Sequence, residues 1–196
     1  MEILLVKKDI KNMAELVLLM YKNTYNAFIE HNRNFIKETL DLEDKVNDLE
    51  KKIIKDLVDL SNSGIDLRII NAYTKVVGDL ELIGDYCKDI LERVEIKIEE
   101  KLLFSKEAVE DYNSLYEKVK EVLLNAVDLI REEKLKEDFN NLNLELDLEK
   151  IKENHQKRLL NGICSPLASN MFLNMVDYTF RIYEYAKEII LALKSV

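Results

Sequence analysis

Three carboxylates stand four residues apart in one stretch of the sequence: Glu81, Asp85 and Asp89. On an α-helix, side chains at this spacing line one face. Carboxylate oxygens are hard ligands that suit magnesium, calcium, manganese or iron. One helix face does not enclose an ion, so a metal site here would need oxygen ligands from a second helix.

A second set of oxygen-bearing side chains lies upstream, beside an apolar stripe. Glu43, Asn47 and Glu50 follow one another at positions i, i+4 and i+7. If the two segments form antiparallel helices across the short turn at 61–64, the two polar faces could converge. The predicted cofactor is then a divalent or trivalent ion: iron, zinc, manganese or magnesium.

A solvated, salt-bridged helix face is the alternative interpretation of the same residues. On a helical wheel, the apolar residues of segment 69–94 lie nearly opposite the acids, which places the acidic stripe on the surface. Like charges at this spacing cost an isolated helix about 0.2–0.5 kcal/mol per pair. Lys88 and Arg93 stand where they could relieve that repulsion. Spacing alone does not decide between the two interpretations.

The acidic segment also belongs to an internal repeat. Residues 79–91 align with residues 178–190, ninety-nine positions later. Four positions are identical between the copies: Ile83, Tyr86, Lys88 and Ile90 match Ile182, Tyr185, Lys187 and Ile189. A tandem repeat indicates two copies of one structural unit.

The second copy departs from the first at the positions that could bind a metal. Phe180 stands where the first acid is expected, and Tyr183 replaces a glycine. Arg181 lies close enough in sequence to neutralise the neighbouring acids. Asn141 and Glu145 are the facing residues in a loose alignment. We therefore expect one competent site at most, in the first half.

Composition and periodicity predict an all-α protein. Glycine occurs four times and proline once, which leaves little to punctuate strands. Helices are expected over about 9–32, 33–60, 66–98, 106–132, 135–160 and 166–196. Asp9, Ser105 and Ser165 are the predicted N-caps, with Pro166 at a first helical position. The pattern predicts two tandem antiparallel three-helix bundles, residues 1–103 and 104–196, packed as one rigid body.

Charge and residue usage exclude several classes of function. The net charge of −9 disfavours nucleic acid as a partner. Apolar runs are far shorter than the ~20 residues of a membrane span, so no membrane insertion is expected. The widely separated Cys87 and Cys164 suggest a reducing cytosol. His155 lies near a helix end, where a positive imidazole would favour the dipole. No Gly-rich loop or nucleophile constellation is apparent, so an enzyme is disfavoured.

Four segments resemble one known family. Residues 80–86, Leu-Glu-Leu-Ile-Gly-Asp-Tyr, resemble the Leu-Glu-Arg-Ile-Gly-Asp signature of PhoU-type phosphate-transport regulators, except that Leu82 replaces the common arginine. Residues 42–50 are similar to that family's second-helix pattern, and residues 104–108 to the opening of its second repeat. Residues 155–166 resemble the turn before the last helix in the PhoU-like domain appended to sodium-phosphate cotransporters.

The resemblance covers nearly the whole chain and implies both a fold and a role. It implies paired three-helix bundles whose acidic motifs hold multinuclear metal clusters. Glu81 and Asp85 match the first acidic pair, and Glu43 and Asn47 match the facing pair. The implied role is a non-enzymatic cytoplasmic regulator, peripheral at the inner face of the membrane. It would contact a membrane phosphate transporter, a sodium-phosphate cotransporter or a phosphate-sensing histidine kinase.

Two other hypotheses stay open at this point. The first is a metal-dependent helical-bundle enzyme or a metal-storage protein that uses the same carboxylates. The surface position of the stripe and the lack of Glu-x-x-His pairs typical of di-iron bundles argue against it. The second is a structural adaptor whose acidic faces only solubilise it. The sequence also leaves open whether the chain forms a homodimer.

Overall fold

A computed structural model describes residues 3–132 and 144–196. The described residues form six α-helices and no strand, which confirms the all-α prediction: α1 (Ile3–Glu30), α2 (Arg33–Ser61), α3 (Leu67–Glu99), α4 (Lys106–Glu132), α5 (Glu145–Leu160) and α6 (Pro166–Lys194). The fifth helix was predicted to start near residue 135, and residues 135–143 lie outside the described ranges. Among the described helices, none combines the length and apolarity needed to cross a bilayer.

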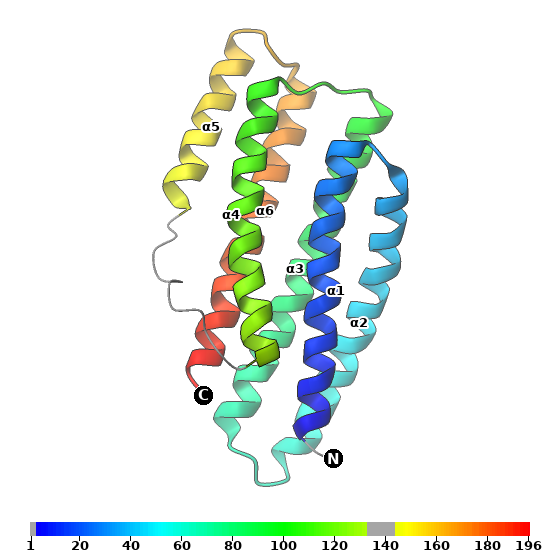
Figure 1. The fold of residues 1–196 in the computed structure, drawn as a ribbon, viewed down its shortest axis with the longest axis vertical. Helices are drawn as coiled ribbons and strands as arrows, with labels where there is room; N and C mark the ends of the chain where they lie inside the picture. Colours follow the sequence, from blue (N-terminus) through cyan, green and yellow to red (C-terminus); the bar gives the residue numbers. More distant parts are fainter. Residues whose placement is uncertain (1–2, 133–143) are drawn as a thin grey trace.

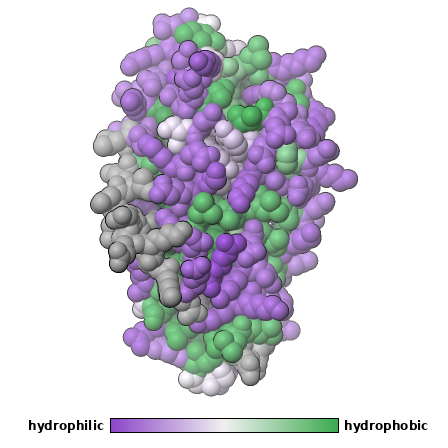
Figure 2. Space-filling view, viewed as in Figure 1, coloured by the Kyte–Doolittle hydropathy of each residue, from purple (hydrophilic) through white to green (hydrophobic). Residues whose placement is uncertain are grey.

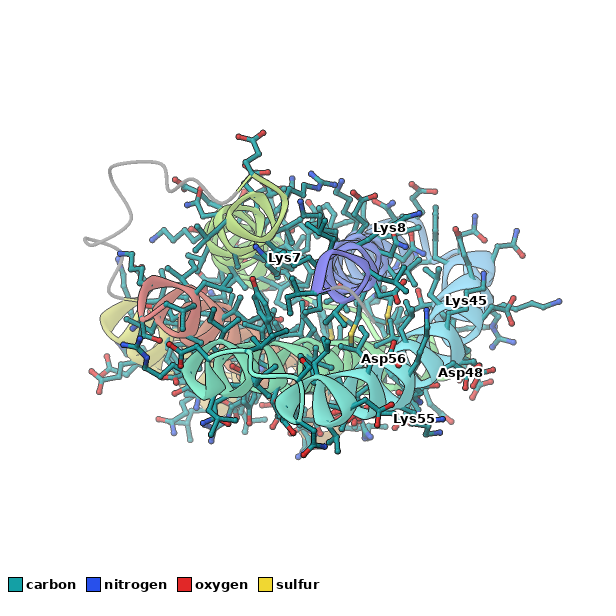
Figure 3. The ribbon with its side chains drawn as sticks, turned by 90° about the horizontal axis from the view of Figure 1, so that it is seen from below. Lys7, Lys8, Lys45, Asp48, Lys55 and Asp56 are labelled. Carbon is teal, nitrogen blue, oxygen red and sulfur yellow. The ribbon has the colours of Figure 1, made fainter. Side chains whose placement is uncertain are left out.

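The helices pack in two layers that run along the long axis (Figure 1). Viewed along the helices, α5, α6, α3 and α2 form one curved layer, and α4 and α1 lie against its inner side (Figure 3). Helices α1, α2 and α3 contact one another as one bundle, and α4, α5 and α6 as the other. The predicted boundary at 103/104 falls in the connection between α3 and α4.

Four of the described helices, α2, α3, α4 and α6, start at a capping side chain, whereas α5 starts without a side-chain cap and α1 departs from the prediction. Ser105 and Ser165 each accept a hydrogen bond at 3.2 Å from the backbone N–H three residues later, and Pro166 opens α6 as predicted. The prediction that Asp9 caps the first helix is wrong. The helix already begins at Ile3, because its apolar stripe includes the fully buried Val6. The Asp9 carboxylate instead forms an ion pair with Lys52 of α2 at 2.6 Å.

The two bundles share one continuous apolar core. Where α1 meets α4, the ring of Tyr21 stacks on Tyr116 with centroids 4.7 Å apart. The Tyr21 hydroxyl donates a buried hydrogen bond to the Tyr116 carbonyl oxygen at 3.1 Å. Burial raises the pKa of Tyr21 well above its ordinary value, so the hydroxyl stays a neutral donor. This contact ties the first half to the second inside the core.

The contact between α3 and α6 is the most extensive between any two of the described helices. Tyr86 and Tyr185, which are equivalent in the repeat, face each other with ring centroids 5.9 Å apart. Away from this central pair, Lys75 of α3 reaches Glu188 of α6 at 3.3 Å. The two helices therefore run antiparallel about a local two-fold axis that relates the repeats.

The surface is largely hydrophilic, with apolar groups gathered in patches. On the face formed by α1 and α4, green apolar patches cross the middle and the lower end (Figure 2). At the lower end, side chains from both bundles line a cavity of about 430 Å³. Its lining is mostly apolar: Ile3, Lys7, Ile65, Ile69, Tyr73, Leu129, Leu193 and Val196.

Because the two halves share one core, we expect them to unfold together. Leu80 of α3 is fully buried, so Leu80→Ala should destabilise the whole molecule by about 2–5 kcal/mol. The control, Val58→Ala, changes a side chain that is 59% exposed and should shift stability by less than about 0.5 kcal/mol. Urea denaturation followed by circular dichroism measures both. Two separate transitions, only one of them shifted by Leu80→Ala, would contradict the single core.

Candidate functional site

Helices α2 and α3 approach each other closely at the level of the candidate residues. A Cβ placed on Gly84 would lie 3.6 Å from the Val46 side chain of α2 and 3.5 Å from Met20 of α1. Glu81 and Asp85 flank this point on α3, while Glu43 and Asn47 flank it on α2. The close approach explains why polar faces far apart in the sequence lie together.

Glu43 is the most tightly held of the candidate carboxylates. The Asn47 side-chain amide donates a hydrogen bond to its Oε1 at 3.0 Å. Lys88 of α3 donates to the same oxygen at 3.2 Å, and the Glu43 side chain is only 12% exposed. Lys88 was expected to relieve repulsion within α3. It also forms the ion pair that links α3 to α2.

Glu81 lies at the centre of the converged carboxylates. Its pKa is raised to about 7, first by burial and then by the charges of Asp85 and Glu50. A hydrogen bond with Asp85 and the charge of Glu43 raise the pKa further. Four carboxylates from two helices therefore act on one another. The acidic stripe is half-buried between the helices, and so only part of it is a solvated face.

Asp89 lies one turn further along α3. Burial raises its pKa, and Glu92 and Asp85 add to that effect. Arg93 and Lys88, also on α3, oppose it. The charges that act most strongly on Asp89 thus come from its own helix. The structure brings together the other five predicted residues and leaves Asp89 at the edge.

The residue types suit a hard cation, but their positions do not form a coordination sphere. Within residues 3–132 and 144–196, no group of three or more His, Cys, Asp or Glu side chains is placed to hold a metal ion. In addition, the Lys88 amine already occupies one oxygen of Glu43. Binding a metal would require these side chains to move. The metal site stays a prediction.

The equivalent surface of the second half is neutralised by ion pairs. Arg181 pairs with Glu184 at 2.7 Å, as the sequence predicted. Asp177 pairs with Lys152 of α5 at 2.5 Å. Tyr183, which replaces the glycine of the first copy, is buried in the core at 2% exposure. Of the predicted facing residues, Asn141 and the side chain of Glu145 lie outside the described part of the chain.

His155 lies in α5, near the end that leads into α6, and has a structural role there. Its ring is 1% exposed and stacks on Phe172 with centroids 4.2 Å apart. Burial, and next the charge of Arg158, lower the pKa of His155 to about 4. The expectation of a positive imidazole at the helix end is therefore wrong, because the ring is neutral near pH 7. Its Nε2 lies 3.9 Å from the Cys164 sulfur.

Comparison with known proteins identifies the fold. Residues 10–94 match the family model of the PhoU domain, a range that includes all six candidate residues. The crystal structure of PhoU from Pseudomonas aeruginosa is similar over 97% of this chain and 96% of that chain, with a TM-score of 0.75 at 18% identity. The chain has the PhoU fold.

A second structure agrees with this fold. The phosphate transport system regulatory protein PhoU from Streptococcus pneumoniae is similar over 96% of this chain and 91% of that chain, with a TM-score of 0.73 at 14% identity. A search among curated proteins gave no significant match. The PhoU resemblance inferred from four short segments is thus supported by the domain match and by the fold. The closer likeness to the cotransporter-linked domain stays a prediction.

Two features of this site were missed from the sequence. The first is the bond from Lys88 to Glu43, and the second is the proton affinity of Glu81. The signal for the first was present, since Lys88 stands one turn beyond Asp85 and an antiparallel α2 must pass beside it. The second depends on burial and on the exact approach of two helices, which spacing does not give.

The raised pKa of Glu81 predicts a pH-dependent stability. The folded chain holds this proton more tightly than the unfolded chain, where the ordinary pKa is 4.5. Ionisation between pH 4.5 and about 7 therefore destabilises the fold, by at most about 3 kcal/mol. Solvent around the half-exposed group reduces this to about 1 kcal/mol. Glu81→Gln should thus be more stable than the native chain above pH 7, and equal to it below pH 4.5.

Urea denaturation at about pH 4, 6 and 8 measures this difference. Asp44→Asn, which changes an exposed acid on α2, is the matched control. A stability gain of Glu81→Gln that is the same at all three pH values would show that the carboxyl does not titrate abnormally.

Proposed function

We propose that the protein is a non-enzymatic regulator of phosphate transport and of phosphate-responsive signalling. One observation carries the proposal: the fold of the Pseudomonas PhoU structure extends over 97% of this chain, and residues 10–94 also match the PhoU domain in sequence. The Streptococcus protein of the same fold is a phosphate transport system regulatory protein. The transfer of this role rests on the combination of domain match and full-length fold.

The proposed mode of action is contact with a membrane protein from the cytoplasmic side. The partner is a membrane phosphate transporter, including a sodium-phosphate cotransporter, or a phosphate-sensing histidine kinase. Cytoplasmic flanks of membrane proteins are enriched in lysine and arginine. A chain with a net charge of −9 is electrostatically complementary to such segments. The protein would therefore lie at the inner face of the membrane while it acts.

Deletion of the chain in its own host tests this role. If the protein limits phosphate uptake when phosphate is abundant, cells that lack it should continue to take up labelled phosphate in phosphate-rich medium. A plasmid copy should restore the restraint. Pull-down of the native chain from phosphate-rich cells should recover the transporter or the kinase, and which of the two appears identifies the partner. Unchanged uptake together with recovery of neither partner would remove the proposed role.

Cation binding between α2 and α3 is the second candidate property. It is supported by the three carboxylates that act on Glu81, since a bound cation would relieve the repulsion among all four. Glu50, Glu81 and Asp85 would supply oxygen ligands, with Glu43 and Asn47 beside them. The ion would be of the hard class, such as magnesium, manganese or iron, although zinc also accepts carboxylates.

Metal analysis of protein purified without chelator or an affinity metal tests this property. Near-stoichiometric iron, manganese or zinc that disappears in Glu81→Gln/Asp85→Asn would support the site. Added metal should also raise the melting temperature of the native chain and not that of the variant. Asp177→Asn, in the second copy, is the matched control and should change neither result. Metal-free native protein with no thermal response to added ions would rule the site out.

A further inference from the structure

A buried lysine near the end of α3 lacks a carboxylate partner. Lys97 is only 6% exposed, and burial lowers its pKa. Its Nζ lies 5.3 Å from the ring centroid of Phe28 and 5.6 Å from that of Phe104. Among the described residues, its one polar side-chain contact is with Nε2 of His31. Within the described residues, no acid lies at ion-pairing distance from Lys97.

The surroundings of Lys97 favour a cation without neutralising it. Helix α1 ends at Glu30 and α3 ends at Glu99, so two helix C-termini lie near this amine. Their partial negative charges favour a cation, as do the faces of the two aromatic rings. Partial charges do not replace a full counter-charge, and a buried ion without one is costly. The site would therefore gain from an external anion.

An open pocket of about 250 Å³ lies beside this amine. Cationic or basic groups form one part of its lining, and aliphatic side chains form the other: His31, Lys97, Lys101, Ile98, Leu102 and Leu103. Leu103, in the connection to α4, is 84% exposed. A pocket with these two parts complements a ligand that carries an anionic group next to a large apolar group.

We propose that this pocket binds a segment of a partner protein in which an acidic side chain stands next to a large apolar side chain. The acid meets Lys97 and Lys101, and the apolar side chain packs on Ile98 and Leu103. The identity of the partner, the transporter or the kinase, rests on the proposed function. The chemistry of binding does not depend on it.

The apolar part of the pocket favours a protein segment over a free inorganic ion. Orthophosphate would pair with the lysines and leave the leucine side chains exposed to water. The turn between α5 and α6 lies at the same end of the molecule as the connection from α3 to α4 (Figure 1). Two further exposed apolar side chains lie at this turn. Leu160 is 85% exposed and Ile163 is 56% exposed. A protein partner could cover these side chains together with the pocket.

Titration of the ¹⁵N-labelled full chain with short synthetic peptides tests the proposal. The probe is an acetylated, amidated peptide that contains the sequence Glu-Phe-Leu. It should cause saturable amide shifts at residues 97–104 and at His31. Analogues with Gln in place of Glu, or with Gly in place of Phe and Leu, should bind at least about tenfold more weakly. Equal binding of the Gln analogue, or no shift at these residues, overturns the proposal.

Orthophosphate is titrated in parallel. Shifts at the same residues with phosphate alone, at an affinity equal to or above that of the peptide, would indicate an ion site and overturn the peptide proposal. Weaker or absent shifts support it.

Lys97→Met separates binding from folding. Methionine has a similar length without the charge, so this variant should melt at the same temperature as the native chain or above it. It should also lose at least about tenfold in peptide affinity. Lys22→Met, which changes an exposed lysine on α1, should keep full affinity. If Lys97→Met fails to fold, Lys101→Met at the pocket rim takes its place, and native affinity in that variant overturns the proposal.

Failure of this pocket is distinguishable from failure of the regulatory role. Loss of phosphate restraint on deletion, without peptide binding, leaves the role in place and removes the pocket. Peptide binding without any effect of deletion on phosphate uptake leaves the pocket in place and removes the role.

Discussion

The antiparallel packing of α3 on α6 is the constraint on which the rest of the structure depends. Neither three-helix bundle is isolated, because equivalent residues of the two repeats meet at this contact and their cores merge. Helices α1 and α4 then fill the inner side of the curved layer, where Tyr21 and Tyr116 stack. Since α3 is fixed by α6 on one side, α2 can pack only on the other side. That geometry places the α2 acids beside the α3 acids.

The two repeats have kept the packing and diverged in their charge. In the first, Gly84 packs against Met20 and Val46, and burial together with the neighbouring carboxylates raises the pKa of Glu81. In the second repeat, the buried Tyr183 stands at the position equivalent to Gly84, and Arg181 forms an ion pair with Glu184. A purely structural unit gains from the second arrangement, because its charges are paired. The first arrangement retains repulsion within a half-buried cluster, which is typical of a functional site.

The fold was predictable because helical periodicity and capping are local properties. Ser105, Ser165 and Pro166 act as the sequence indicated, and the internal repeat predicted paired bundles. The N-cap prediction for Asp9 was wrong, because the sequence does not show that Val6, upstream of it, is buried as part of the same helix. The convergence of the acids on α2 and α3 also followed from spacing and a short turn. The protonation of Glu81 and the neutral state of His155 did not, because both depend on burial by distant segments.

One row of side chains on α3 joins the two regions that we consider functional. Its members stand four residues apart, three acids followed by two bases: Glu81, Asp85, Asp89, Arg93 and Lys97. Lys101 follows the end of the helix, with a φ of 52°. Bases near a helix C-terminus are favoured by the macrodipole, so the basic half of the row suits the end of α3. The equivalent positions of α6 hold Phe180, Glu184, Glu188 and Ala192, without a base. Packing requires no such order of charges, since α6 fills the equivalent place without it. Packing therefore does not account for the order of charges along α3, and this order is what the proposed cation site and the proposed pocket have in common.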